Sequence, residues 1–115
     1  MEAALAAQGT PYRYGGSGPD AFDCSGLVDF AARRAGISVP RTAAEQFRAG
    51  AAVKREALQA GDLVFMRLKR ELHVGIMISA DRFVHAPSSG GRVRIDQLDA
   101  APYARAYKGA RRLRP

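Results

Sequence analysis

The chain has 115 residues, of which 47 % are hydrophobic and 25 % are charged, so we expect one soluble globular domain spanning residues 1–115. Its single cysteine excludes an internal disulfide framework, and no run of about 18 apolar residues is present to form a transmembrane segment. The net charge of +7 favours anionic surroundings, such as nucleic acid, an anionic membrane face or an acidic cell-wall polymer.

The first half of the chain is predicted to be helical. Residues 9–22 are rich in Gly, Pro and Ser, which is typical of a structured loop. Asp23 is then a natural N-cap for a helix that begins at Cys24 and is closed by Gly36, because apolar residues recur at helical spacing between them. A capping-box pattern at residues 42–45 opens a short second helix that ends near Gly50.

The second half of the chain changes to the period of β-strands. In residues 72–78, LHVGIMI, apolar side chains alternate with His73, Gly75 and Met77, so the two sets face opposite sides of a sheet. The other predicted strands are LVFM, FVHAP, RVRI and the tail from Tyr103 to Leu113, with turns at RLKRE, SADR and SSGG. Helices followed by an antiparallel meander predict an α+β domain with helices packed on one face of the sheet.

The two ends of the chain differ in character. The opening stretch MEAALAAQG lacks the basic start and the long apolar run of a secretory signal peptide, so none is expected. No acidic residue follows Asp99, whereas several basic residues do. These basic residues are Arg105, Lys108, Arg111, Arg112 and Arg114.

Cys24 is predicted to lie at the first turn of a helix, where unpaired backbone N–H groups and the positive end of the helix dipole stabilise a thiolate. A thiolate is the nucleophile of cysteine hydrolases, and it needs an imidazole to accept and return a proton. The two histidines of the chain, His73 and His85, lie in neighbouring predicted strands. The three side chains can therefore form a nucleophile, a base and a group that orients the base.

Simpler interpretations of the same residues remain open at this point. A lone cysteine in an apolar helix is commonly a small buried hydrophobic residue, and a histidine in a strand is commonly a hydrogen-bonded core residue. One cysteine and two histidines also match the ligand set of a catalytic zinc ion, although the sequence offers no obvious outer shell of partners for it.

Six segments taken in order resemble the motifs of the NlpC/P60 family of papain-like cysteine peptidases. They are GTPYRYGG, FDCSGLV, PRTAAEQ, AGDLVF, HVGIMI and FVHAP, and the similarity runs from about Gly9 to Arg112. The resemblance implies a papain-like NlpC/P60 fold, with N-terminal helices packed on a central antiparallel sheet. It also implies hydrolysis of stem-peptide bonds in bacterial peptidoglycan, commonly the bond between D-γ-glutamate and a diamino acid, with no cofactor and no metal.

The resemblance assigns a role to each site residue. Cys24 matches the nucleophile, His73 the general base and acid, and His85 the group that orients the base. Tyr12 matches a catalytic tyrosine near the thiol, whose hydroxyl helps to hold the oxyanion or the substrate. Asp23 and Ser25 flank the nucleophile, where family members hold a substrate amine, although Asp23 can also do no more than cap the helix. Arg41 resembles the arginine of a PRT motif and is expected to be structural.

The expected partners are peptidoglycan stem peptides, with anionic wall polymers held by the basic C-terminal residues. The expected location is the periplasm or cell envelope, and because no signal peptide is expected, an exported effector, a phage-associated protein and an excised domain remain open. The alternative from another class is a non-catalytic wall-binding or structural module, such as a component of a phage tail or a secretion apparatus. An acyl hydrolase or transferase on a related scaffold also remains open. A nucleic-acid binder is suggested by charge alone, and the sequence holds no recognised binding motif, so no specific nucleic-acid complex is expected.

Overall fold

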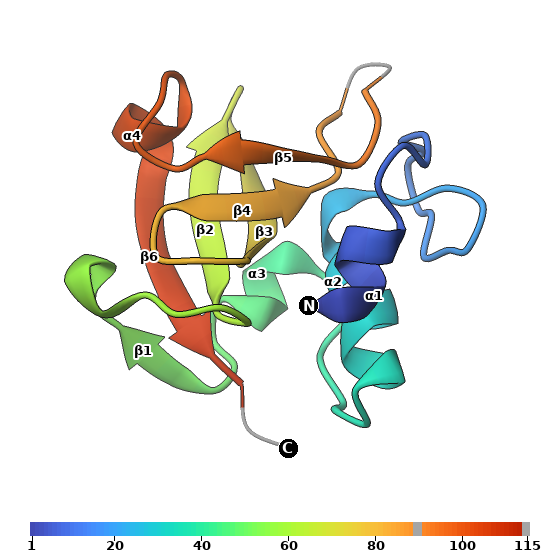
Figure 1. The fold of residues 1–115 in the computed structure, drawn as a ribbon, viewed down its shortest axis with the longest axis horizontal. Coiled ribbons are helices and arrows are strands. Elements are labelled where there is room, and N and C mark those ends of the chain that lie inside the picture. Colours follow the sequence, from blue (N-terminus) through green and yellow to red (C-terminus); the bar gives the residue numbers. More distant parts are fainter. Residues whose placement is uncertain (89–90, 114–115) are drawn as a thin grey trace.

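The computed structural model describes residues 1–88 and 91–113, in which six strands form one antiparallel sheet in the order β1-β6-β2-β3-β4-β5 (Figure 1). The strands are β1 (Ala51–Val53), β2 (Leu63–Leu68), β3 (Glu71–Met77), β4 (Arg82–His85), β5 (Arg94–Gln97) and β6 (Tyr107–Arg112). The helices are α1 (Glu2–Ala6), α2 (Cys24–Arg34), α3 (Ala43–Gln46) and α4 (Tyr103–Ala106), with a 3-10 turn, η1 (Arg55–Ala57). The predicted α+β class is confirmed.

The helix α2 begins where the sequence predicts it. The carboxylate of Asp23 accepts a hydrogen bond from the backbone N–H of Gly26 at 2.6 Å, which confirms its role as N-cap. In the predicted capping box, Thr42 accepts a hydrogen bond from the backbone N–H of Glu45 at 3.3 Å. The helix α3 that follows is shorter than expected, because it ends at Gln46 rather than near Gly50.

The strands of the second half match the predicted runs, with shifts at their ends. β2 and β3 extend into the predicted turn RLKRE and leave only residues 69–70 as the turn, and β4 ends at His85 rather than continuing to Pro87. β5 begins at Arg94, two residues later than the predicted strand RVRI. The tail is predicted as a strand from Tyr103, but residues 103–106 form the helical turn α4 after Pro102, and β6 begins at Tyr107. Two residues of the predicted SSGG turn, Ser89 and Gly90, lie outside the described residues. The short elements α1 and β1 were not predicted.

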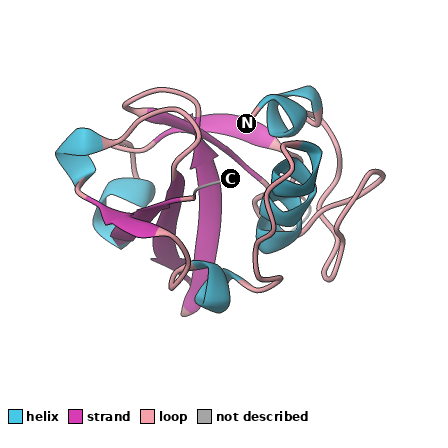
Figure 2. Cartoon of the chain, turned by 90° about the horizontal axis from the view of Figure 1, so that it is seen from below, coloured by secondary structure: helices cyan, strands magenta, loops and turns pink. Residues whose placement is uncertain are grey.

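Apolar side chains fill both faces of the sheet. On one face, Leu27 and Val28 of α2 pack with Phe65, Val74 and Ile76 of the sheet, and the N-terminal helix α1 joins the same cluster. Figure 2 shows α1 and α2 together on one side of the sheet. Alternate residues of the same strands point to the opposite face, where α4 contributes cover. That second cluster contains Val64, Met66, Met77, Phe83, Leu98 and Tyr103. Burial on both faces explains why β2 reads as a continuous apolar run.

Candidate active site

Cys24 is the first residue of α2, and its side chain is partly exposed. β3 pairs with β2 from Glu71 to Ile76, but it pairs with β4 only through Ile76 and Met77. The ladder with β4 therefore does not include Val74. The thiol of Cys24 lies beside the backbone N–H of this residue. Because Val74 directly follows His73, this contact brings the N-terminus of α2 to the strand that carries the first histidine.

The protonation state of the thiol differs from the sequence expectation. Burial raises the pKa of Cys24, and the charge of Asp23 adds to this effect, while backbone N–H groups of Val74, Ser25 and Cys24 itself oppose it. The net shift is upward, because the loss of water around the sulfur outweighs the helix N-terminus, and this direction favours a protonated thiol in the free enzyme.

His73 and His85 form a hydrogen-bonded pair across β3 and β4. Nε2 of His73 lies 2.7 Å from Nδ1 of His85, and both rings are buried, with 7 % and 0 % of the residue exposed. Burial, followed by the charge of His85, lowers the pKa of His73 to about 3. Burial also lowers the pKa of His85, although a hydrogen bond and the charge of Asp96 oppose this shift. Both imidazoles are therefore neutral at pH 7.

Gly75 provides the space in which His85 sits. A Cβ atom on Gly75 would lie 2.6 Å from Cδ2 of Phe83 and 3.2 Å from Cβ of His85. Contacts this short between carbon atoms force the neighbours apart. The glycine between His73 and Ile76 thus allows β4 to bring the second histidine close to the first.

A polar group behind His85 was missed by sequence reasoning. Oδ2 of Asp96, in β5, lies 2.6 Å from Nε2 of His85 and 2.8 Å from Nε of Arg94. The hydroxyl of Tyr103, in α4, donates to the same oxygen at 3.3 Å. In the sequence, Asp96 directly follows the predicted strand RVRI, and a carboxylate in that place is typical of an exposed strand end. The available signal was the pair Arg94 and Asp96, which share one face of a strand in a hairpin with FVH.

Tyr12 lies in the loop before α2, where its backbone N–H donates to the carbonyl of Gly91 at 2.9 Å. Its side chain is partly buried against the core that α2 covers. Burial raises the pKa of Tyr12, and the negative charges of the Cys24 thiolate form, Asp23 and Glu71 raise it further. The phenol therefore keeps its proton and can donate a hydrogen bond near the thiol.

Asp23, Ser25 and Arg41 form a network beside Cys24. The guanidinium of Arg41 donates to the hydroxyl of Ser25 at 2.8 Å, to the carboxylate of Asp23 at 3.1 Å and to the carbonyl of Gly16 at 3.3 Å. Asp23 also accepts from the backbone N–H of Gly15 at 3.0 Å. These bonds confirm the structural role predicted for Arg41. The binding of a substrate amine by Asp23 and Ser25 stays a prediction.

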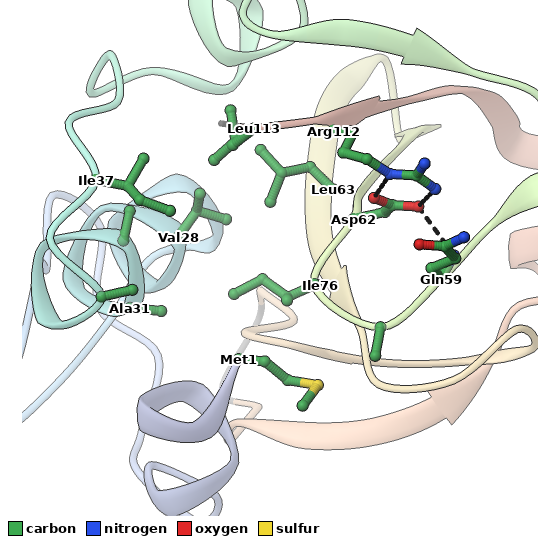
Figure 3. A pocket seen from close by; sticks show the side chains of 14 residues that line it. Met1, Val28, Ala31, Ile37, Gln59, Asp62, Leu63, Ile76, Arg112 and Leu113 are labelled. Carbon is green, nitrogen blue, oxygen red and sulfur yellow. Dashed lines mark hydrogen bonds and ion pairs between the residues drawn. The ribbon is translucent and has the colours of Figure 1, made fainter. Parts of the chain in front are cut away.

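A pocket of about 320 Å³ is lined by residues of α2, the start of β2, the end of β6 and Met1 (Figure 3). Apolar side chains such as Val28, Leu63 and Ile76 line it, and an ion pair between Asp62 and Arg112 at 2.8 Å lies at one side. The residues that line this pocket do not include Cys24 or either histidine. The site around Cys24 and the two histidines is therefore not part of the lining of this apolar pocket.

Within residues 1–88 and 91–113, no group of three or more His, Cys, Asp or Glu side chains is arranged to hold a metal ion. None of the helices in that part of the chain is both long enough and apolar enough to span a bilayer.

Comparison with known proteins identifies the relatives of the chain. The profile of the NlpC/P60 family matches residues 9–112. The chain is 41 % identical to murein DD-endopeptidase MepH of Escherichia coli, over 91 % of this chain and 41 % of that protein. It is 36 % identical to a gamma-D-glutamyl-L-lysine dipeptidyl-peptidase of Bacillus cereus, over 93 % of this chain and 33 % of that protein.

Solved structures share the fold. A crystal structure of an NlpC/P60 family protein from Bacillus cereus superposes with a TM-score of 0.90 at 35 % identity, covering 97 % of this chain and 38 % of that chain. A lipoprotein-like NLP/P60 protein from Staphylococcus aureus gives a TM-score of 0.87 at 36 % identity, covering 100 % of this chain and 40 % of that chain. This chain thus spans less than half the length of these relatives. By its sequence motifs, its profile match and its fold, the chain belongs to the NlpC/P60 family.

Proposed function

We propose that this chain is a cysteine endopeptidase that hydrolyses stem-peptide bonds of peptidoglycan, with Cys24 as nucleophile and His73 as general base and acid. The observation that carries the proposal is the meeting of α2 and β3. The Cys24 thiol lies beside the backbone N–H of Val74, one residue from His73, and the His73 ring is hydrogen-bonded to His85. The names of the relatives, which include a murein endopeptidase, support the class of substrate.

The first chemical step starts from a neutral pair. Burial raises the pKa of Cys24 and lowers the pKa of His73, so the thiol keeps its proton until a substrate arrives. We expect the S–H proton to pass to His73 as the sulfur attacks the scissile carbonyl carbon, while the carbonyl π electrons move to the oxygen. Closure of the site by the substrate shortens such proton-transfer contacts relative to the free enzyme.

The oxyanion that forms has two donors available. The backbone N–H of Cys24, in the first turn of α2, has no partner within the helix, and the phenol of Tyr12 keeps its proton. His73 then returns the proton to the leaving amine nitrogen, the C–N bond breaks and a thioester remains on Cys24. Water attacks the thioester with His73 as base, which releases the carboxylate product and restores the thiol.

We place the scissile bond between D-γ-glutamate and the diamino acid of the stem. The name of the Bacillus cereus relative supports this choice, whereas the name of the Escherichia coli relative points to a crosslink bond. In this proposal Asp23 and Ser25 hold a substrate amine. Because Arg41 already pairs with both side chains, the amine would share the carboxylate of Asp23 with a guanidinium.

We further propose that the basic C-terminal residues contact anionic wall polymers and that the enzyme acts in the cell envelope. Arg105 and Lys108 are exposed and free to make such contacts. Two others have partners in the fold, because Arg111 lies 5.8 Å from the ring centre of Phe47 and Arg112 pairs with Asp62. The fifth, Arg114, lies outside the described residues.

Incubation with defined muropeptides tests the proposal. The substrates are a free tetrapeptide stem and a crosslinked dimer, and mass spectrometry of the products locates each cleaved bond. We expect cleavage of the D-γ-glutamyl bond, complete loss of activity in Cys24→Ala, and unchanged activity in the control Ser38→Ala, which alters an exposed loop residue. Cleavage of the crosslink alone would change the assigned bond and keep the chemistry.

Two results would reject the proposal. Full activity in Cys24→Ala would exclude the thiol mechanism. A wild-type protein that pellets with peptidoglycan, leaves both substrates intact and does not react with alkylating agents would be a non-catalytic wall-binding module.

A further inference from the structure

The carboxylate of Asp96 is the end point of three hydrogen bonds. Its Oδ2 atom accepts from Nε2 of His85 at 2.6 Å, from Nε of Arg94 at 2.8 Å and from the hydroxyl of Tyr103 at 3.3 Å. A second nitrogen of Arg94 donates to the hydroxyl oxygen of Tyr103 at 3.4 Å, which turns the hydroxyl proton toward Asp96. The Asp96 side chain is 26 % exposed, whereas the ring of His85 is fully buried.

The charge state of Asp96 fixes what it can do. Burial by itself raises the pKa of this carboxyl, but hydrogen bonds from Arg94 and His85, together with their charges, outweigh burial and the net pKa is lowered. The group is therefore an ionised carboxylate, which can accept hydrogen bonds and cannot donate them. It follows that Nε2 of His85 carries the ring proton that lies on this 2.6 Å bond.

The tautomer of His85 fixes the direction of the hydrogen bond to His73. His85 is neutral and has its proton on Nε2, so its Nδ1 carries a lone pair and must accept from His73. Nε2 of His73 therefore holds the proton of the 2.7 Å bond between the rings. Because His73 is also neutral, its remaining nitrogen, Nδ1, is left with a free lone pair.

We propose that Asp96, held by Arg94 and Tyr103, is a positioning residue that fixes the direction of the hydrogen bonds through His85 and so presents His73 Nδ1 as the base for Cys24. This inference rests on the proposed function of Cys24 and His73. In the reacting complex the S–H proton of Cys24 moves to Nδ1 of His73, while the protons on both Nε2 atoms stay where Asp96 places them.

If the hydrogen bond between the two rings ran from His85 to His73, Nδ1 of His73 could no longer act as a base. With the proton of His85 on Nδ1, that nitrogen would donate to Nε2 of His73, and the proton of His73 would lie on Nδ1. His73 could then no longer accept a proton from Cys24. A buried pair of neutral histidines can adopt both directions, so an acceptor at the outer end of the array has a chemical purpose.

Two substitutions at Asp96 distinguish the contribution of its acceptor oxygen from that of its negative charge. Asp96→Ala removes the acceptor, so both directions become possible. Asp96→Asn removes the charge and keeps an oxygen, and the donors Arg94 and Tyr103 turn that oxygen, rather than the amide NH2, toward themselves and His85. The control is Asp99→Ala, which makes the same change at an exposed carboxylate three positions along the chain.

The first measurement is kcat and KM on a muropeptide substrate. We expect Asp96→Ala to lower kcat about 10- to 100-fold, by analogy with the loss of a group that orients a metal-binding imidazole, with KM little changed. We expect Asp96→Asn to lower kcat only about two- to tenfold, because a neutral acceptor still forms the bond. Asp99→Ala should match the wild type.

The second measurement does not depend on activity. The 15N NMR shifts of the ring nitrogens in the wild type should show both histidines protonated on Nε2, and Asp96→Ala should show a mixture at His85. The opposite tautomers in the wild type would overturn the inference, as would full kcat in Asp96→Ala or an equal loss in Asp96→Asn and Asp96→Ala. If the wild type hydrolyses no substrate, the proposed function fails, while the ring shifts still decide whether Asp96 sets the direction.

Discussion

Replacement of Gly75 by alanine tests how tightly the strands around the histidines are packed. The added Cβ would lie 2.6 Å from Cδ2 of Phe83, against an ordinary contact of about 3.5 Å or more, so the ring would have to move by about 1 Å. Phe83 cannot move freely, because it is fully buried between His85 and Tyr103, with ring centres 4.5 Å and 5.1 Å away.

The size of the effect follows from two opposing contributions. Forcing an extra methyl group into a packed core costs about 1 to 3 kcal/mol, while replacing glycine by alanine in a strand recovers about 0.5 to 1 kcal/mol of chain entropy. We therefore expect Gly75→Ala to lower the free energy of unfolding by about 1 to 2 kcal/mol. For a domain of this size the melting temperature should fall by about 4 to 8 °C.

Urea unfolding of a double-mutant cycle with Phe83→Leu provides the assay. The smaller side chain withdraws the ring edge that meets the new Cβ, so the two changes together should destabilise by about 1 kcal/mol less than their sum. Because Phe83 packs against His85, Gly75→Ala alone should also lower activity. Unfolding energies that add within about 0.5 kcal/mol would show that the overlap with Phe83 is not the cause and would refute this reasoning.

Two further predictions concern pH. Because burial raises the pKa of Cys24, the rate of alkylation by iodoacetamide should keep rising with pH above 7, without the plateau at acidic pH that a stable thiolate and imidazolium pair gives; such a plateau would contradict the neutral pair. The pKa of His73 is about 3 in the folded chain and about 6.5 in the unfolded chain, so the unfolded state binds the extra proton and stability should fall as pH drops from 6.5 toward 3. Urea unfolding at pH 7 and pH 4.5 should show a smaller loss in His73→Gln than in the wild type, and equal losses would exclude His73 as a titrating group.

The sequence was sufficient for the parts of the fold that depend on local pattern. Asp23 caps α2, Cys24 opens it, and the alternation in residues 72–78 puts His73 and Met77 on one face of the sheet. The neighbouring strands predicted for His73 and His85 indicated that the two rings can meet, which the 2.7 Å contact confirms. These features follow from spacing along the chain, which a sequence displays directly.

Features that depend on the pairing register of the strands, or on the burial of a side chain away from water, could not be predicted from the sequence. Asp96 reaches His85 because β4 and β5 pair His85 with Arg94, and nothing in the letters RVRIDQ fixes that register. The thiol of Cys24 was expected to ionise, since the helix end is visible in the sequence, whereas the burial that raises its pKa is a property of the packed fold. Likewise, the turn α4 at residues 103–106 interrupts a segment whose composition suits a strand.

β6 is the latest strand in chain order, yet it lies between β1 and β2 (Figure 1). Val64 of β2 pairs with Ala110 of β6, and both residues are buried. Until residues 107–112 have been synthesised, β2 therefore has no hydrogen-bonded neighbour on the side away from β3. A growing polypeptide already carries the nucleophile and both imidazoles at that moment, but it lacks the sheet that supports them. The proposed site therefore has no complete supporting sheet until residues 107–112 are present, and a chain truncated before them would expose an edge prone to aggregation.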